Sequence, residues 1–227
     1  MIKKVRIFIL ICIFILGVII LLYPFITNRL FDEEVKIIEN KYKEIIGLQN
    51  NLNLLNKLLR DENNKIYNNK QDSFINQKIS FEEKQIDLSK YGFNNNIIGF
   101  IRIPSINVKL PIYLGASLKN MNYGAVHLTG TSYPIGGINT NSVIAAHRAY
   151  YKAKMFRDID KIKIGDYLYI DIFNETLKYN AVKIDIINPM DFNKLTIVDG
   201  KDIVTIMSCH PYKSREKRYV VYFERVI

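Results

Sequence analysis

An uncharged run of 20 residues near the N-terminus, Ile7 to Ile26, constrains this chain more than any other feature. A helix needs about 20 apolar residues to cross about 30 Å of hydrocarbon, so the run predicts a membrane-spanning anchor. The excess positive charge precedes the run, so we expect residues 1–6 to be cytoplasmic and residues 27–227 to lie outside the cell. A cleaved signal peptide is the alternative, but its apolar region is shorter and ends in an Ala-x-Ala-like site, which is absent here.

The residues that follow, up to about Tyr67, have apolar positions that recur in steps of three, four and seven. That spacing is typical of a helix, so we expect a helical stalk. The stretch from Asn63 to Gln77 is polar and rich in Asn, which is typical of a loose, solvated linker. We therefore expect residues 27–85 to form a stalk and linker, and residues 86–227 to form the folded domain.

The residue pattern changes after Ile97, where short runs of β-branched and aromatic residues alternate with turns rich in Gly, Pro and Asn. The runs are 97–103, 108–113, 142–146, 167–173, 178–187, 203–208 and 218–226. Such runs are typical of strands. With few helices, and one short helical turn near residues 153–160, they predict an all-β domain that closes into a barrel rather than a parallel α/β sheet.

Composition excludes several classes of protein. The two cysteines, Cys12 in the apolar run and Cys209 near the other end, cannot form a disulfide framework. Three His and one Cys outside the run are too few for a dedicated metal cage, so we expect no metal and no cofactor. The net charge is +10, but 23 of the 32 basic residues are Lys spread along the chain, which indicates a solvated basic surface and no nucleic-acid partner.

Three residues at predicted strand ends suggest chemistry: His147, Cys209 and Arg218. Cys209 and Arg218 are nine positions apart, so an eight-residue loop between antiparallel strands would bring the Arg back beside the thiol, where a cation favours thiolate. Taken singly, each residue is more often a core or solvated group. An exported, unpaired thiol is nevertheless a liability unless it is used, and Cys–His catalysis needs only these two side chains and an oxyanion donor.

Several motifs in order carry a resemblance to a known family. They are Ile98–Pro104, Leu110–Tyr113, Val126–Gly137, Ala146–Arg148, Lys154–Asp160, Lys163–Asp166 and Ser208-Cys209 followed nine residues later by Arg218. Over about residues 86–227 the chain strongly resembles a sortase. The resemblance is greatest to the class C, pilus-assembling branch, with Ser208 in place of the Thr that usually precedes the signature Cys.

The resemblance implies an eight-stranded β-barrel and a cysteine transpeptidase of the Gram-positive cell surface. The implied substrate is a sorting signal of the Leu-Pro-x-Thr-Gly type. Cys209 thiolate would attack the Thr carbonyl, and His147 as imidazolium would protonate the departing Gly amine. Arg218 would donate hydrogen bonds to the oxyanion or to the substrate carbonyl. A pilin Lys or a peptidoglycan cross-bridge amine would then resolve the thioacyl enzyme.

The other two histidines fit the catalytic role less well. His127 matches a family position outside the catalytic pair, and His210 is adjacent to Cys209, where neighbouring strand residues point apart. We therefore expect His147 to be the catalytic histidine.

The chain also departs from the class C pattern. No proline lies between residues 25 and 103, which excludes the Asp-Pro-aromatic lid that commonly precedes the barrel, and no second hydrophobic helix follows the last predicted strand. We therefore expect an open cleft, unless Phe74, Ile75 or Phe81 covers it by other means. Pilin polymerisation and wall anchoring both stay open. A catalytically silent, membrane-tethered β-domain that binds a surface protein or wall polymer is the alternative of another class.

Overall fold

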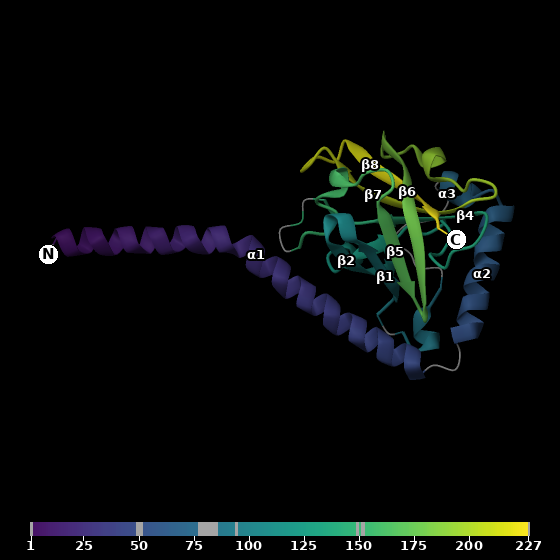
Figure 1. Cartoon of the computed structure of the whole chain (residues 1–227), viewed down its shortest axis with the longest axis horizontal. Coiled ribbons are helices and arrows are strands. Elements are labelled where there is room, and N and C mark those ends of the chain that lie inside the picture. The colour runs from purple at the N-terminus through teal and green to yellow at the C-terminus, as the bar shows by residue number, and fades with distance from the viewer. Residues whose placement is uncertain are drawn as a thin grey trace.

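The computed structural model of the chain describes residues 2–48, 52–76, 86–93, 95–148, 150 and 153–226 (Figure 1). Eight strands form a closed barrel in the order β1-β2-β3-β4-β7-β8-β6-β5, which confirms the predicted eight-stranded barrel. The strands are β1 (Ile97–Ile103), β2 (Val108–Leu114), β3 (Ala125–His127), β4 (Thr140–Ala145), β5 (Tyr167–Ile172), β6 (Glu175–Ile187), β7 (Asp202–His210) and β8 (Lys217–Arg225).

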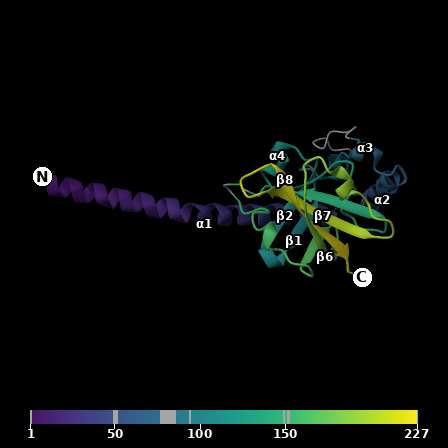
Figure 2. The same ribbon diagram turned by 90° about the horizontal axis from the view of Figure 1, so that it is seen from above.

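Helices precede the barrel and interrupt its connections. They are α1 (Ile2–Leu48), α2 (Leu52–Asn68), α3 (Asp72–Ile75) and α4 (Leu118–Met121), with short 3₁₀ helices η1 (Leu88–Tyr91), η2 (Pro104–Ile106), η3 (Ile159–Lys161) and η4 (Phe192–Leu195). The helical turn expected near residues 153–160 corresponds to a run of turns that leads into η3. Figures 1 and 2 both place α2 and α3 on the side of the barrel away from the N-terminus.

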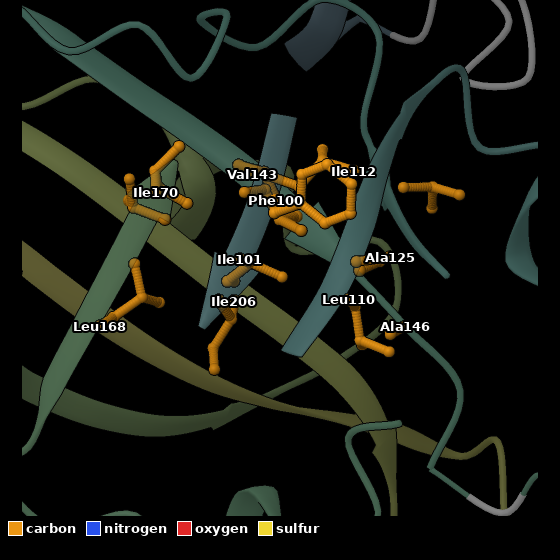
Figure 3. Close-up of a cluster of buried hydrophobic side chains, with 14 of the residues drawn as sticks. Phe100, Ile101, Leu110, Ile112, Ala125, Val143, Ala146, Leu168, Ile170 and Ile206 are labelled. Carbon is orange, nitrogen blue, oxygen red and sulfur yellow. The ribbon is translucent and has the colours of Figure 1, made fainter. Parts of the chain in front are cut away.

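The barrel interior is filled by aliphatic and aromatic side chains from most of its strands (Figure 3). In β1 nearly every residue is buried, on both faces of the strand. The outer face is buried because α1 lies across it: Tyr42 packs edge-on against Phe100 with ring centroids 5.4 Å apart. The Tyr42 hydroxyl also donates to the carbonyl of Ile98 at 2.6 Å and accepts from the backbone N–H of Phe173 at 3.1 Å. The second half of α1 is therefore part of the domain.

The first half of α1 carries the predicted membrane anchor. It is long and apolar enough to cross a membrane, and among the described residues it is the one helix with this property. Its large apolar side chains between Ile7 and Ile26 are exposed around the whole helix, as expected where lipid rather than protein is the solvent. Pro24 lies inside the helix, near the end of the apolar run.

The stalk is not the single helix that the periodicity predicts. Helix α1 ends at Leu48, α2 begins at Leu52, and the two run in different directions along the barrel (Figure 1). Leu55 and Leu59 of α2 are fully buried. The apolar spacing therefore reflects two helices that pack against the barrel, and the prediction of one unbroken helix is wrong.

The prediction of a loose linker is also wrong for residues 63–76. Asn63 is 4% exposed; its side-chain amide donates to the carbonyl of Tyr133 at 3.2 Å and its oxygen accepts from the Tyr133 N–H at 2.7 Å. The Gln71 side chain accepts from the N–H of Ile197 at 2.6 Å. These amides satisfy backbone groups of barrel loops, which a polar composition alone does not reveal.

Of the two aromatic residues considered as substitutes for a lid, Phe74 lies among the described residues. Phe74 is fully buried and packs against Phe192 with ring centroids 5.4 Å apart. Phe192 lies in the connection before β7, at the opposite end of that strand from Cys209. Phe74 therefore does not cover Cys209. Phe81 lies outside the described residues, and the open cleft stays a prediction.

Candidate active site

Cys209 and Arg218 face each other across two antiparallel strands. In the ladder between β7 and β8, Cys209 pairs directly with Arg218, and His210 pairs with Lys217. Directly opposite residues project to the same face of a sheet, with Cβ atoms about 4.5–5.5 Å apart. The eight residues between Cys209 and Arg218 thus return the Arg to the thiol, as the spacing predicts, and both residues are half-buried.

His147 reaches the same place from a third strand. β4 and β7 run parallel, and their ladder ends at the pair Ala145–Met207. His147 and Cys209 each lie two residues beyond that pair. The N–H of Ala146 continues the ladder with a hydrogen bond of 3.3 Å to the carbonyl of Met207. The three residues predicted from the sequence therefore meet at one end of β4, β7 and β8.

The His147 side chain is held by its own loop. Its ring stacks on Tyr150, with centroids 5.4 Å apart and planes 20° from parallel. Its carbonyl accepts from the N–H of Phe156 at 3.0 Å. Partial burial and, second, the positive charge of Arg215 lower the pKa of His147 below its usual 6.5. The resting ring is therefore mostly neutral at neutral pH.

Arg218 is oriented by the loop between β7 and β8. Its Nη1 donates to the carbonyls of Arg215 at 3.0 Å and Lys217 at 3.1 Å. Within the described part of the chain its Nε and Nη2 donate no hydrogen bond. One edge of the guanidinium is thus anchored, and the other has donors available for an oxyanion or a substrate carbonyl.

His127 is a structural residue. It is 2% exposed, stacks on Tyr133 at 5.1 Å, and places Nε2 3.0 Å from the carbonyl of Ser132. A carbonyl only accepts, so Nε2 carries the proton of the neutral ring. Burial lowers the pKa of His127 to about 4, which keeps the ring uncharged. His210 lies on the opposite face of β7 from Cys209, since its rung of the ladder is the next one.

Known proteins share both sequence and fold with this chain. The family model described as the sortase domain matches residues 101–226, more than half of the chain. The chain belongs to the sortase family. Among curated relatives, Sortase A of Bacillus anthracis is 31% identical to this sortase over 127 residues, which cover 55% of this chain and 58% of that protein.

Two solved structures extend the likeness beyond the barrel. Sortase C from Clostridium perfringens SM101 is 34% identical, with a TM-score of 0.62, and the match covers 85% of this sortase and 99% of that chain. Streptococcus agalactiae sortase C1 is 28% identical, with a TM-score of 0.65 and coverage of 83% and 93%. Residues 86–227 cannot account for such coverage, so the match includes helices before the barrel. The structural likeness therefore extends beyond the resemblance in sequence, which covers about residues 86–227.

Sequence reasoning missed two polar residues that join the strand ends of this sortase. Ser208 and Arg148 are both buried, and they are the chain neighbours of Cys209 and His147. The Ser208 hydroxyl donates to the carbonyl of Ala146 at 2.7 Å. Both residues lie inside the quoted motifs, but a motif does not show burial. The feature of the sequence that points to Arg148 is its position directly after the candidate catalytic His147.

The prediction that no metal is required remains a prediction. Within the described ranges, no group of three or more His, Cys, Asp or Glu side chains is placed to hold a metal ion.

Proposed function

We propose that this sortase is a membrane-anchored cysteine transpeptidase in which Cys209 is the nucleophile, His147 the general acid and base, and Arg218 the oxyanion donor. The observation that carries the proposal is the direct pairing of Cys209 with Arg218 at the strand end that lies beside His147. A catalytically silent β-domain needs none of these residues, and their convergence favours the enzyme.

The chemistry follows from these three groups. Once the His147 ring has taken the proton of the Cys209 thiol, the Cys209 thiolate attacks the carbonyl carbon of the substrate Thr, and the developing oxyanion accepts hydrogen bonds from the unanchored edge of Arg218. The Thr–Gly C–N bond then breaks as His147 gives its proton to the leaving amine, and a thioester remains on Cys209. An acceptor amine attacks the thioester, loses its proton to His147, and forms the new amide as the thiolate leaves.

The substrate in this proposal is a surface protein with a Leu-Pro-x-Thr-Gly-type sorting signal, and the preferred acceptor is a pilin Lys. A similar solved structure, the pilus-related sortase C of Group B Streptococcus, matches 75% of this chain and supports this choice. Anchoring to a peptidoglycan cross-bridge amine is the second candidate, because curated relatives carry the name Sortase A. The acceptor experiment below separates the two.

The proposed topology places residues 1–6 in the cytoplasm, residues 7–26 in the membrane and the remainder outside, attached to the cell membrane of a Gram-positive bacterium. Residues 86–227 form the catalytic domain in this proposal. Helix α2 and the second half of α1 are required to complete its core, because Tyr42, Leu55 and Leu59 are buried.

Turnover of a fluorogenic Leu-Pro-x-Thr-Gly peptide tests the proposal. The full-length chain carries Cys12→Ser, so that Cys209 is the one remaining thiol. A methanethiosulfonate reagent is expected to abolish turnover, and persistent turnover would contradict a thiol enzyme. A pilin-type Lys peptide and a peptidoglycan cross-bridge peptide are then supplied in parallel. Preferential ligation to the Lys peptide supports pilus assembly, and preferential ligation to the cross-bridge peptide assigns wall anchoring.

A further inference from the structure

Arg148 follows His147 in the chain, yet its side chain turns into the protein. Only 4% of it is exposed, which is rare for an arginine. A buried guanidinium is costly unless its charge is paired and its donors are used. Its partners therefore indicate what the burial achieves.

The partners of Arg148 lie around Cys209. Nη1 donates to Nδ1 of His210 at 3.0 Å and approaches the carbonyl of Cys209 at 3.4 Å. Nη2 forms an ion pair of 2.7 Å with Asp160, the half-exposed acid of η3. The guanidinium carbon lies 5.7 Å from the centre of the Tyr219 ring, next to Arg218. The Arg148 side chain thus contacts Cys209 itself and Tyr219, the chain neighbour of Arg218.

These contacts begin where the backbone ladder stops. The hydrogen-bonded ladder between β4 and β7 ends just before His147 and Cys209. On one side of the pair, Ser208 joins Ala146 through its hydroxyl. On the other side, Arg148 joins Cys209 and His210. Beyond this last backbone bond, side-chain bonds on both sides hold the His147 segment against the Cys209 segment.

We infer that Arg148 is a positioning residue for transpeptidation: it fixes the end of the His147 strand against the end of the Cys209 strand. The inference rests on the proposed roles of Cys209 and His147. Arg148 serves this purpose because its planar fork reaches Asp160, His210 and the Cys209 carbonyl at once. The ammonium of a Lys is a point donor and cannot reproduce that set. Asp160 neutralises the charge and orients the fork.

The test uses the full-length Cys12→Ser protein and measures single-turnover thioester formation at saturating Leu-Pro-x-Thr-Gly peptide. Amplitude reports the fraction of competent enzyme, and rate reports the alignment of the reacting groups. Arg148→Met and Arg148→Lys are each expected to acylate about 10- to 100-fold more slowly per competent enzyme, the loss that a misplacement of about 1 Å produces. KM and the rate of iodoacetamide alkylation of Cys209 should change by less than about threefold.

Arg102→Met is the matched control. Arg102 makes a two-pronged ion pair with Asp171 between β1 and β5, at 2.5 and 2.9 Å, away from the three strands of the site. Its loss should lower amplitude or stability and leave the rate unchanged. An Arg148→Met enzyme that loses amplitude but acylates at the wild-type rate would have lost only a structural ion pair, and the inference would be overturned.

Asp160→Asn keeps the inference testable if Arg148→Met does not fold. Asp160 is 48% exposed, so this variant is expected to fold and to acylate about 3- to 10-fold more slowly. A wild-type rate in Asp160→Asn would contradict the inference in that case.

Cys209→Ala separates this inference from the proposed function. A covalent acyl adduct in Cys209→Ala would refute the proposed function, whereas the absence of an adduct there, with a wild-type rate in Arg148→Met, refutes the role of Arg148 alone.

Discussion

The Asn63 side chain of α2 and the backbone of Tyr133 exchange two hydrogen bonds, one to the Tyr133 N–H and one to its carbonyl. Tyr133 lies in the same loop as Ser132, whose carbonyl accepts from the buried His127 ring. The contact joins a helix before the barrel to the loop that enters β4, the strand leading to His147. Helix α2 thus supports the site from the far end of β4.

Asn63→Ala is expected to lower the free energy of unfolding by about 1–3 kcal/mol, because it leaves two buried backbone groups of Tyr133 without their partner. Urea unfolding of the full chain in detergent, followed by near-UV circular dichroism, measures the change. Asn53→Ala on an exposed face of the same helix is the control and should change stability by less than about 0.5 kcal/mol. Equal stability of the two variants would mean that α2 is not docked through Asn63.

Arg218→Lys is expected to fold and to lose about 10²–10³ in acylation rate, the usual loss for one oxyanion donor. Lys keeps the positive charge. It lacks the planar guanidinium, which donates from one edge to the Arg215 and Lys217 carbonyls and has donors for the substrate on the other edge. Arg225 lies on the same strand, seven residues further on, and the variant Arg225→Lys serves as the control. If Arg218→Lys turns over at about the rate of Arg225→Lys, Arg218 supplies only a positive charge and no specific hydrogen bonds.

The pKa of His147 depends on the loop between β7 and β8. The positive charge of Arg215 makes protonation of the ring less favourable and so lowers this pKa. Arg215→Gln is therefore expected to raise the pKa, though not fully to 6.5, because burial is the larger cause and remains. More imidazolium is then present at a given pH, and the alkaline limb of the acylation profile should move to higher pH.

NMR titration of isotopically labelled histidines measures this shift directly. Lys213→Gln removes a positive charge from the same loop and is the matched control. A pKa of His147 that is unchanged in Arg215→Gln, or that rises equally in Lys213→Gln, would show that Arg215 has no specific effect.

The buried His127 should make the domain sensitive to acid. Its pKa falls from 6.5 to about 4 on folding, so between these values the unfolded chain binds a proton that the native chain excludes. The stability present above pH 6.5 is therefore lost as the pH falls toward 4, by about 3 kcal/mol at about 1.4 kcal/mol per unit. His127→Gln keeps a donor for the Ser132 carbonyl and should show a flatter pH dependence of unfolding. Identical pH slopes in the two proteins would contradict this account.

The barrel and the proposed site were largely predictable, since strands of β-branched residues have a local pattern and a hairpin places Cys209 opposite Arg218. Strand β3 was missed because its three residues are too few to show a period. The roles of Asn63 and Arg148 were hidden for another reason. Each makes its main contacts with residues about 60 to 70 positions away. A polar residue that is expected to be exposed from the sequence is therefore buried in the fold.

The central claim is that Cys209 forms an acyl intermediate with a sorting signal. The most direct measurement is the intact mass of the full-length Cys12→Ser enzyme, quenched in acid during turnover of a Leu-Pro-x-Thr-Gly peptide. We predict an adduct of the mass of the peptide acyl portion ending at Thr, released by hydroxylamine as a thioester is, and absent from Cys209→Ala. An adduct that persists in Cys209→Ala, or an enzyme that turns over without any adduct in the Cys12→Ser protein, would contradict the account.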